Sequence, residues 1–138
     1  MKIRKIMQTE LVVLRAEEPL IKALEATASE RIRHLPIVDG DRLVGMVTIT
    51  DIKHATPSPL IEGNQAEYRK ILYDTPVSRI MRRSPITASP DATLAEVMRL
   101  MVANKIGCLP IVEGDKLVGI VSEIDVLKAL LEVLEILE

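Results

Sequence analysis

Hydrophobic and polar positions follow two periods along this chain, and both periods recur in its second half. Leu94, Val97 and Met101 fall on one face at helical spacing and predict an amphipathic helix. Short apolar runs at 35–38 and 42–48 flank Asp39-Gly40-Asp41 and predict a β-hairpin. Each half of the chain therefore predicts the order β-α-β-β-α.

The two halves form an internal repeat, because residues 4–55 reappear as residues 78–129 without a gap. Leu35-Pro36-Ile37-Val38 returns as Leu109-Pro110-Ile111-Val112, and Asp51 returns as Asp125. A repeat of this kind sets the number of sites and the architecture. We expect an α+β fold in which two β-α-β-β-α repeats pack as a pseudo-two-fold pair. Repeat 1 is expected at 1–56, a linker at 57–77 and repeat 2 at 78–138.

Turn and cap residues place the remaining elements. Short strands are expected at 11–14 and 85–87, and a short helix at 66–72 within the linker. The prolines of segment 56–59 are expected to end the last helix of repeat 1.

One helix of repeat 2 carries recognisable end residues. Thr93-x-x-Glu96 has the form of a capping box at its start, and the first repeat has Pro19 at the matching place. Gly107 is expected to adopt the left-handed conformation that ends this helix.

Composition narrows the class of protein. Hydrophobic residues make up 48% of the 138 residues, but there is no Trp or Phe, so the core must be aliphatic. The net charge of −2 disfavours a protein that coats nucleic acid, which would carry a basic surplus. Cys108 has no second cysteine to pair with, and the apolar segment 124–137 is too short and too charged to span a bilayer. We expect a soluble cytoplasmic protein without a membrane anchor.

One chemical pattern occurs in both repeats: Thr48-x-x-Asp51 and Ser122-x-x-Asp125 each follow a strand that begins at a glycine. A carboxylate accepts two hydrogen bonds and so matches the vicinal hydroxyls of a ribose, while a hydroxyl and free helix amides favour a phosphate. The alternative is structural, because an N-cap hydroxyl followed by an acid at N3 needs only these residue types. Both interpretations stay open at this stage.

These motifs resemble tandem cystathionine-β-synthase (CBS) domains, also called a Bateman module. The resemblance is carried by the Leu-Pro-Ile-Val stretches, the two hydroxyl-x-x-Asp endings and the opening at 85–94. Segment 55–59 also looks like the CBS portion of acetoin-utilisation-type proteins. The resemblance implies a regulatory module without a catalytic cofactor, which senses AMP, ADP, ATP, S-adenosylmethionine or another adenosine derivative. It also implies a homodimer, and it leaves room for an unidentified target protein.

The resemblance further implies two composite clefts that each use both repeats. The first would join Thr48 and Asp51 to Thr87, Lys105, Gly107 and Cys108. The second would join Ser122 and Asp125 to Val13, Arg33 and His34. The two clefts are expected to differ, since Arg33 and His34 align with Gly107 and Cys108.

Several of these residues also have simpler interpretations. Arg31, Arg33 and His34 would suit a solvated helix end, Arg82-Arg83 an exposed turn, and Cys108 a small buried position. Arg82 or Arg83 would be an alternative phosphate ligand in the first cleft. We find no catalytic or metal-binding constellation and expect no enzyme activity.

Two other functional classes remain. The segment 127–137 is more apolar than one buried face requires, which favours a structural or protein-interaction module that dimerises without a nucleotide. Nucleic-acid binding would use Arg31, Arg33, Arg82 and Arg83, and the net charge disfavours it.

Overall fold

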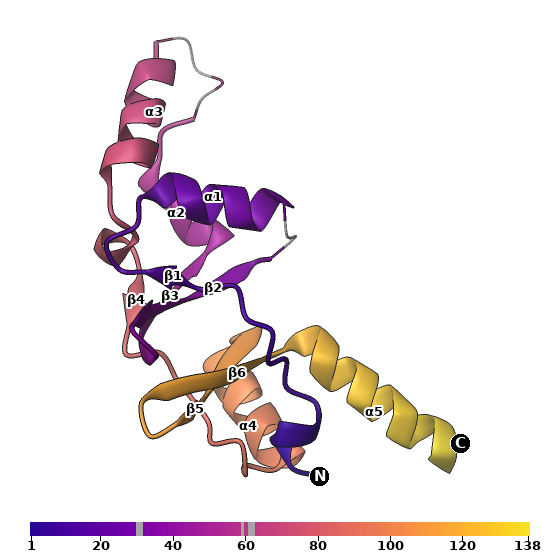
Figure 1. The fold of residues 1–138 in the computed structure, drawn as a ribbon. Coiled ribbons are helices and arrows are strands. Elements are labelled where there is room, and N and C mark those ends of the chain that lie inside the picture. The colour runs from indigo at the N-terminus through magenta and orange to yellow at the C-terminus, as the bar shows by residue number, and fades with distance from the viewer. Residues whose placement is uncertain (30–31, 59, 61–62) are drawn as a thin grey trace. The chain divides into compact units, whose positions relative to one another are not determined.

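The computed structural model describes residues 1–29, 32–58, 60 and 63–138, and it divides the chain into two compact units (Figure 1). Unit 1 combines Met1–Leu11 with Ile86–Glu138, and unit 2 is Val12–Pro85. Residues 1–11 and 75–85 occupy equivalent places in the repeat and are called the entry segments below. Each entry segment belongs to the unit that is built mainly from the other repeat.

Unit 2 contains a four-stranded sheet in the order β1-β2-β3-β4. Strand β1 runs parallel to β2, and the β2–β3 and β3–β4 pairs are antiparallel. Its elements are β1 (Leu14–Arg15), α1 (Leu20–Ser29), β2 (His34–Asp39), β3 (Arg42–Thr48), α2 (Ile49–Ala55), α3 (Gln65–Asp74), a 3-10 turn (Val77–Arg79) and β4 (Arg82–Arg83).

Unit 1 repeats this topology in the same register. Its elements are a 3-10 turn (Ile3–Lys5), α4 (Leu94–Asn104), β5 (Cys108–Glu113), β6 (Lys116–Ser122) and α5 (Glu123–Leu137). A parallel bridge from Ala88 to Ile111 takes the place of β1, and an antiparallel bridge from Gln8 to Ile120 takes the place of β4. The α+β fold expected from the two repeats is confirmed.

Most local predictions hold, and two are wrong. Helix α3 includes the predicted segment 66–72, α2 ends at Ala55, and Thr93 and Glu96 form the expected capping box. The strands expected at 11–14 and 85–87 lie later in the chain, because pairing to β2 and β5 begins only at Leu14 and Ala88.

The second wrong prediction concerns the end of α4. Lys105, not Gly107, adopts the left-handed conformation there, with φ 54° and ψ 46°. Gly107 has another role, because it leaves room for the end of the Glu123 side chain, which lies where a Cβ at position 107 would be.

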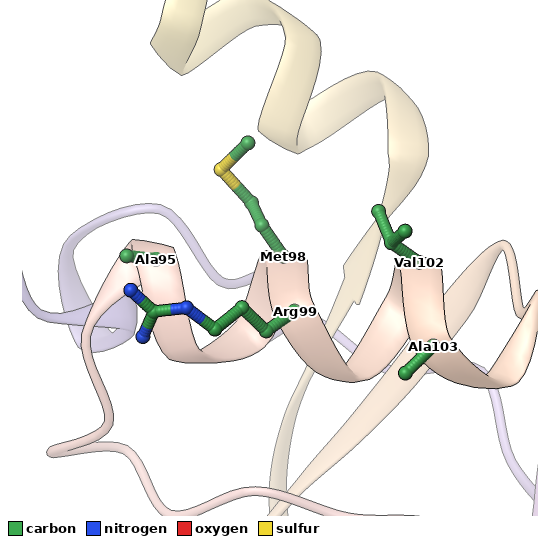
Figure 2. A pocket seen from close by; sticks show the side chains of 5 residues that line it. All are labelled: Ala95, Met98, Arg99, Val102 and Ala103. Carbon is green, nitrogen blue, oxygen red and sulfur yellow. The ribbon is translucent and has the colours of Figure 1, made fainter.

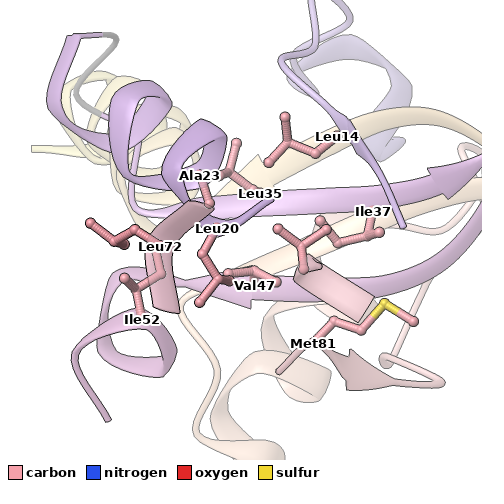
Figure 3. Packing of buried hydrophobic residues seen from close by; sticks show 10 residues of the cluster. Leu14, Leu20, Ala23, Leu35, Ile37, Val47, Ile52, Leu72 and Met81 are labelled. Carbon is pink, nitrogen blue, oxygen red and sulfur yellow. The ribbon is translucent and has the colours of Figure 1, made fainter. Parts of the chain in front are cut away.

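Each unit has its own aliphatic core. Figure 3 shows the core of unit 2, where Leu20 of α1 meets Leu35 and Ile37 of β2 and Val47 of β3. In unit 1 the corresponding strand residues are Leu109, Ile111 and Val121, which pack with Val97 of α4.

The entry segments add one fully buried side chain to each core. Val77 contributes to unit 2, and Ile3 contributes to unit 1. These two residues are 74 positions apart and thus equivalent in the repeat. The entry segments are therefore integral parts of the two cores.

Candidate functional site

The two hydroxyl-x-x-Asp motifs form capping boxes at the start of α2 and α5. Thr48 Oγ1 accepts a hydrogen bond from the Asp51 amide at 3.1 Å, and Asp51 Oδ2 accepts one from the Thr48 amide at 2.9 Å. Ser122 and Asp125 make the same pair of bonds at 3.3 and 2.9 Å. The N-cap interpretation is thus correct for both motifs, and the caps hold each carboxylate in a fixed place.

The other oxygen of each carboxylate contacts an entry segment. Arg82 Nε donates to Asp51 Oδ1 at 3.2 Å, and the Asp51 side chain is only 10% exposed. Gln8 Nε2 donates to Asp125 Oδ1 at 3.0 Å and lies 3.2 Å from its Oδ2. Sequence reasoning overlooked Gln8. The repeat could have identified it, because Gln8 aligns with Arg82.

The glycine that opens each motif explains how the entry segment comes so close. A Cβ on Gly45 would lie 2.6 Å from Met81 Sδ and 3.0 Å from the Arg82 carbonyl oxygen. A Cβ on Gly119 would lie 2.7 Å from Met7 Sδ and 3.1 Å from the carbonyl oxygen of the next residue, Gln8. Only glycine lets the entry segment lie against the strand, which places residue 82 or 8 beside the carboxylate.

The residues before each Leu-Pro pair lie next to the motif of their own repeat. His34 pairs with Thr48 across the β2–β3 ladder, and the Arg33 carbonyl accepts a hydrogen bond from the Ile49 amide at 3.3 Å. In unit 1, Cys108 pairs with Ser122 in the same way. The structure therefore brings Arg33 and His34 together with Thr48 and Asp51.

Cys108 is buried, as the simpler interpretation of this residue predicts. Burial, and to a smaller extent the nearby charge of Asp125, raise the pKa of its thiol from 9.0 to about 12. At neutral pH the thiol is protonated, so Cys108 offers a small apolar wall rather than a nucleophile.

The remaining predicted ligand residues belong to a different unit from the carboxylate that each is predicted to join. Val13 is exposed, Thr87 is half-buried, and Lys105 is exposed at the end of α4. Both composite clefts join residues of different units, so they remain predictions. The predictions that involve Arg31 and Pro59 concern positions outside the described residues.

A separate apolar hollow lies on the exposed face of α4 (Figure 2). None of the predicted ligand residues lines it; its lining residues are Ala95, Met98, Arg99, Val102 and Ala103. Among the described helices, none has both the length and the apolar character needed to cross a membrane.

Comparison with known proteins identifies the family of both repeats. The family model of the CBS domain matches residues 3–58 and again residues 77–132. A CBS domain-containing protein of Dictyostelium discoideum is 31% identical over 135 residues, which cover 96% of this chain and 93% of the relative. Other curated relatives are longer: the chain spans 43% of an uncharacterised 33.4 kDa protein of Thermofilum pendens, to which it is 32% identical over 130 residues.

Solved structures show the same similarity. A Vibrio cholerae structure named for acetoin utilisation has a TM-score of 0.81 and 30% identity, and the match covers 98% of this chain and 93% of that one. The CBS domain pair of protein MJ0100, solved with 5-methylthioadenosine and S-adenosyl-L-methionine, has a TM-score of 0.76 and 26% identity, with 94% of this chain and 99% of that one covered. The doubled topology, the two capped Asp motifs and these matches agree: the chain belongs to the CBS domain family and is a tandem CBS pair.

Proposed function

We propose that this CBS pair is a regulatory module that binds an adenosine-containing ligand, with Asp51 and Asp125 as the ribose-binding residues. The observation that carries the proposal is the equivalent setting of the two carboxylates. Each is fixed by its cap through Oδ2 and meets an entry segment through Oδ1. A carboxylate has about four lone-pair positions. Among the described hydrogen bonds Asp51 accepts from the Thr48 amide and from Arg82, which leaves capacity for the two hydroxyls of a ribose. Asp125 accepts from the Ser122 amide, the Ser122 hydroxyl and Gln8, so a ribose there must replace the Gln8 amide. The adenosine ligands of the MJ0100 domain pair support this choice.

The same contacts offer a route from binding to regulation. A diol that binds Asp51 or Asp125 must share the carboxylate with Arg82 or Gln8, and these residues belong to the entry segments. A ligand would therefore change how firmly an entry segment is held. A ligand can shift a conformational equilibrium only through such differential contacts. In this proposal the module reports energy or cofactor status to a target protein, and it acts by binding, without catalysis.

The sites can take two forms under this proposal. In composite clefts, Thr87, Lys105 and Cys108 would complete the site of Asp51, while Val13, Arg33 and His34 would complete the site of Asp125. In sites built within one unit, Arg33 and His34 would instead serve Asp51, because they lie next to its motif. AMP, ADP, ATP and S-adenosylmethionine are the ligands to compare first.

A second copy of the chain is the proposed partner of α5. Four residues with 3-4-3 spacing form an apolar stripe along this helix, and each is about half exposed: Ile124, Leu127, Leu131 and Leu134. Such a stripe is typical of a helix that packs on another helix.

Calorimetry with AMP, ATP and S-adenosylmethionine tests the ribose role. We expect Asp51→Asn and Asp125→Asn each to weaken binding at its own site by about tenfold to a hundredfold, because a hydrogen bond to a charged group contributes roughly 1.5–3 kcal/mol. Asparagine keeps an acceptor oxygen for the cap amide, so it separates ligand binding from capping better than alanine does. Glu96→Gln makes the matching change in the Thr93 capping box and should leave binding unchanged. Wild-type affinity in both Asp variants would contradict the proposal.

The capping boxes favour one rival function, a protein-interaction module with empty clefts. In that case Asp51 and Asp125 serve only α2 and α5. Thermal shift assays would then find no stabilisation by any adenosine ligand, while Asp51→Ala and Asp125→Ala would still lower the melting temperature.

A further inference from the structure

The two Asp sites differ in charge, although their strands pair in the same register and their helices begin with the same capping box. Four equivalent pairs around the carboxylates differ in the same direction. Asp51 of unit 2 has Arg82, Arg33, His34 and Ile49 where Asp125 of unit 1 has Gln8, Gly107, Cys108 and Glu123. At these positions unit 2 has two permanent cations around one carboxylate. Unit 1 has two carboxylates and no cation.

Contacts within each unit place these residues at the start of the helix that carries the carboxylate. Arg82 bonds Asp51 directly, and Arg33 is connected through its carbonyl to the first residue of α2, Ile49. In unit 1 the Gly107 carbonyl accepts the equivalent bond from the Glu123 amide at 3.0 Å. The Glu123 side chain lies over Gly107, since a Cβ there would meet its carboxylate carbon at 3.2 Å.

Arg82 has donors that the bond to Asp51 does not use. A guanidinium carries five N–H groups, and only Nε makes this bond, which leaves the four on the terminal nitrogens for another acceptor. The Arg82 side chain is 70% exposed, whereas the Asp51 side chain is 10% exposed. A ligand that places its diol on Asp51 would thus meet an accessible cation beside it. A phosphate is the anionic group that a guanidinium binds best.

The site around Asp125 has the opposite character. Gln8 has a neutral amide at the position equivalent to Arg82, and Glu123 adds a second negative charge. The raised pKa of the Cys108 thiol, to which the charge of Asp125 contributes, agrees with this negative surrounding. Lys105 does not alter the contrast, because it aligns with another cation, Arg31.

We propose that residues 82 and 8 set the ligand charge that each site accepts. Asp51 with Arg82 selects a phosphorylated adenosine, and Asp125 with Gln8 selects an adenosine derivative without a phosphate. This inference rests on the proposed function in the form that builds each site within one unit, because it assumes that both carboxylates bind ribose beside the residues of their own unit. It makes the tandem pair a sensor of two different ligands rather than a duplicate sensor of one.

AMP and adenosine are the probes that test this assignment, since they share base and ribose and differ in the phosphate. Asp125→Asn leaves only the Asp51 site to be measured, and Asp51→Asn leaves only the Asp125 site. In the Asp125→Asn protein, adding Arg82→Gln should weaken the affinity for AMP by about tenfold to a hundredfold and change the affinity for adenosine far less. In the Asp51→Asn protein, adding Gln8→Arg should raise the affinity for AMP relative to the affinity for adenosine. Arg79→Gln is the matched control, because it makes the same charge change at an exposed position of the same entry segment.

The outcomes separate the two proposals. If AMP and adenosine bind but their affinity ratio is unchanged by Arg82→Gln and by Gln8→Arg, the charge assignment is wrong and the proposed function stands. If neither AMP nor adenosine binds the wild-type protein, the charge assignment fails. If ATP and S-adenosylmethionine also fail to bind, the proposed function fails with it. Gln8→Arg also controls for misfolding. We expect it to raise the affinity for AMP, and a damaged protein would not show such a gain.

Discussion

Gln8 Nε2 donates a hydrogen bond to Asp125 Oδ1 at 3.0 Å, although 117 positions separate the two residues in the sequence. The equivalent contact from Arg82 to Asp51 spans only 31 positions. The two repeats therefore share a local topology but differ in how far along the chain each entry segment lies from the repeat it completes.

The buried residues of the entry segments should stabilise opposite repeats. Ile3→Ala should cost about 2–5 kcal/mol, because it leaves a cavity in the core of unit 1. Amide hydrogen exchange should accelerate in β5 and β6, more than 100 residues away in sequence. Val77→Ala is the matched variant and should accelerate exchange in β2 and β3 instead. Faster exchange in β2 and β3 of the Ile3→Ala variant would contradict this division of the chain.

The motif glycines should not tolerate a methyl group. Gly119→Ala and Gly45→Ala place a Cβ against a methionine sulfur and a backbone carbonyl, so each should destabilise the fold by roughly 1–3 kcal/mol through overpacking. Chemical denaturation measures the loss. Adding Met7→Ala to Gly119→Ala should recover only part of it, since the Gln8 carbonyl still stands 3.1 Å from the new Cβ. An unchanged denaturation midpoint in both single variants would contradict the prediction, because it would show that the entry segments can shift away from the strand at little cost in free energy.

The Cys108 thiol should be inert in the folded protein at pH values where a free cysteine reacts. Its pKa is raised from 9.0 to about 12, so at pH 9 only about one thousandth of the folded molecules carry a thiolate. Alkylation by iodoacetamide at pH 9 should be slow until denaturant is added. Asp125→Asn should speed it only moderately, because burial is the larger cause. Rapid labelling of the native protein would contradict the buried environment.

The same raised pKa has a consequence for stability. The folded state binds the thiol proton more tightly than the unfolded state, so its contribution is fully present below pH 9 and declines as the pH rises towards 12. Cys108→Ser, whose hydroxyl does not titrate in this range, should show a weaker loss of stability between pH 9 and pH 11 in urea denaturation.

The apolar stripe of α5 should control the oligomeric state. Leu127→Glu combined with Leu131→Glu should convert a dimer to a monomer in sedimentation equilibrium, because two charges would be buried in the helix contact. Leu60→Glu is the control, since Leu60 is 93% exposed and lies away from α5 in the sequence. A wild-type protein that sediments as a monomer would refute the proposed dimer.

Much of the local structure was predictable from sequence because its causes are local. The hairpins, the Thr93–Glu96 cap and the helix at 66–72 follow from turn residues and periodicity within a few positions. The conformation at 107 was not predictable in this way. There the side chain of Glu123, 16 positions later, lies over the glycine, and Lys105 adopts the left-handed conformation.

The candidate site was predictable only in part for the same reason. Thr48, Asp51, Ser122 and Asp125 could be found from a motif that occurs twice. The repeat alignment shows which residues are alike, but not which repeat an entry segment packs against. The alignment with Arg82 marks Gln8 as an equivalent position, but its contact with Asp125 depends on residues 1–11 lying in the unit of the second repeat.

The exchanged entry segments also fix an order of events during synthesis. Unit 2 is one continuous segment that ends at Pro85, so it can fold while the rest of the chain is still being made. Unit 1 encloses it in the sequence, so residues 1–11 are synthesised before unit 2 and their partners after it. At about 5–20 residues per second, Asp125 is synthesised roughly 6–23 s after Gln8, because 117 positions separate the two residues. Throughout that interval Ile3 and Met7 lack the core against which they pack, so unit 1 can fold only after unit 2 has been synthesised.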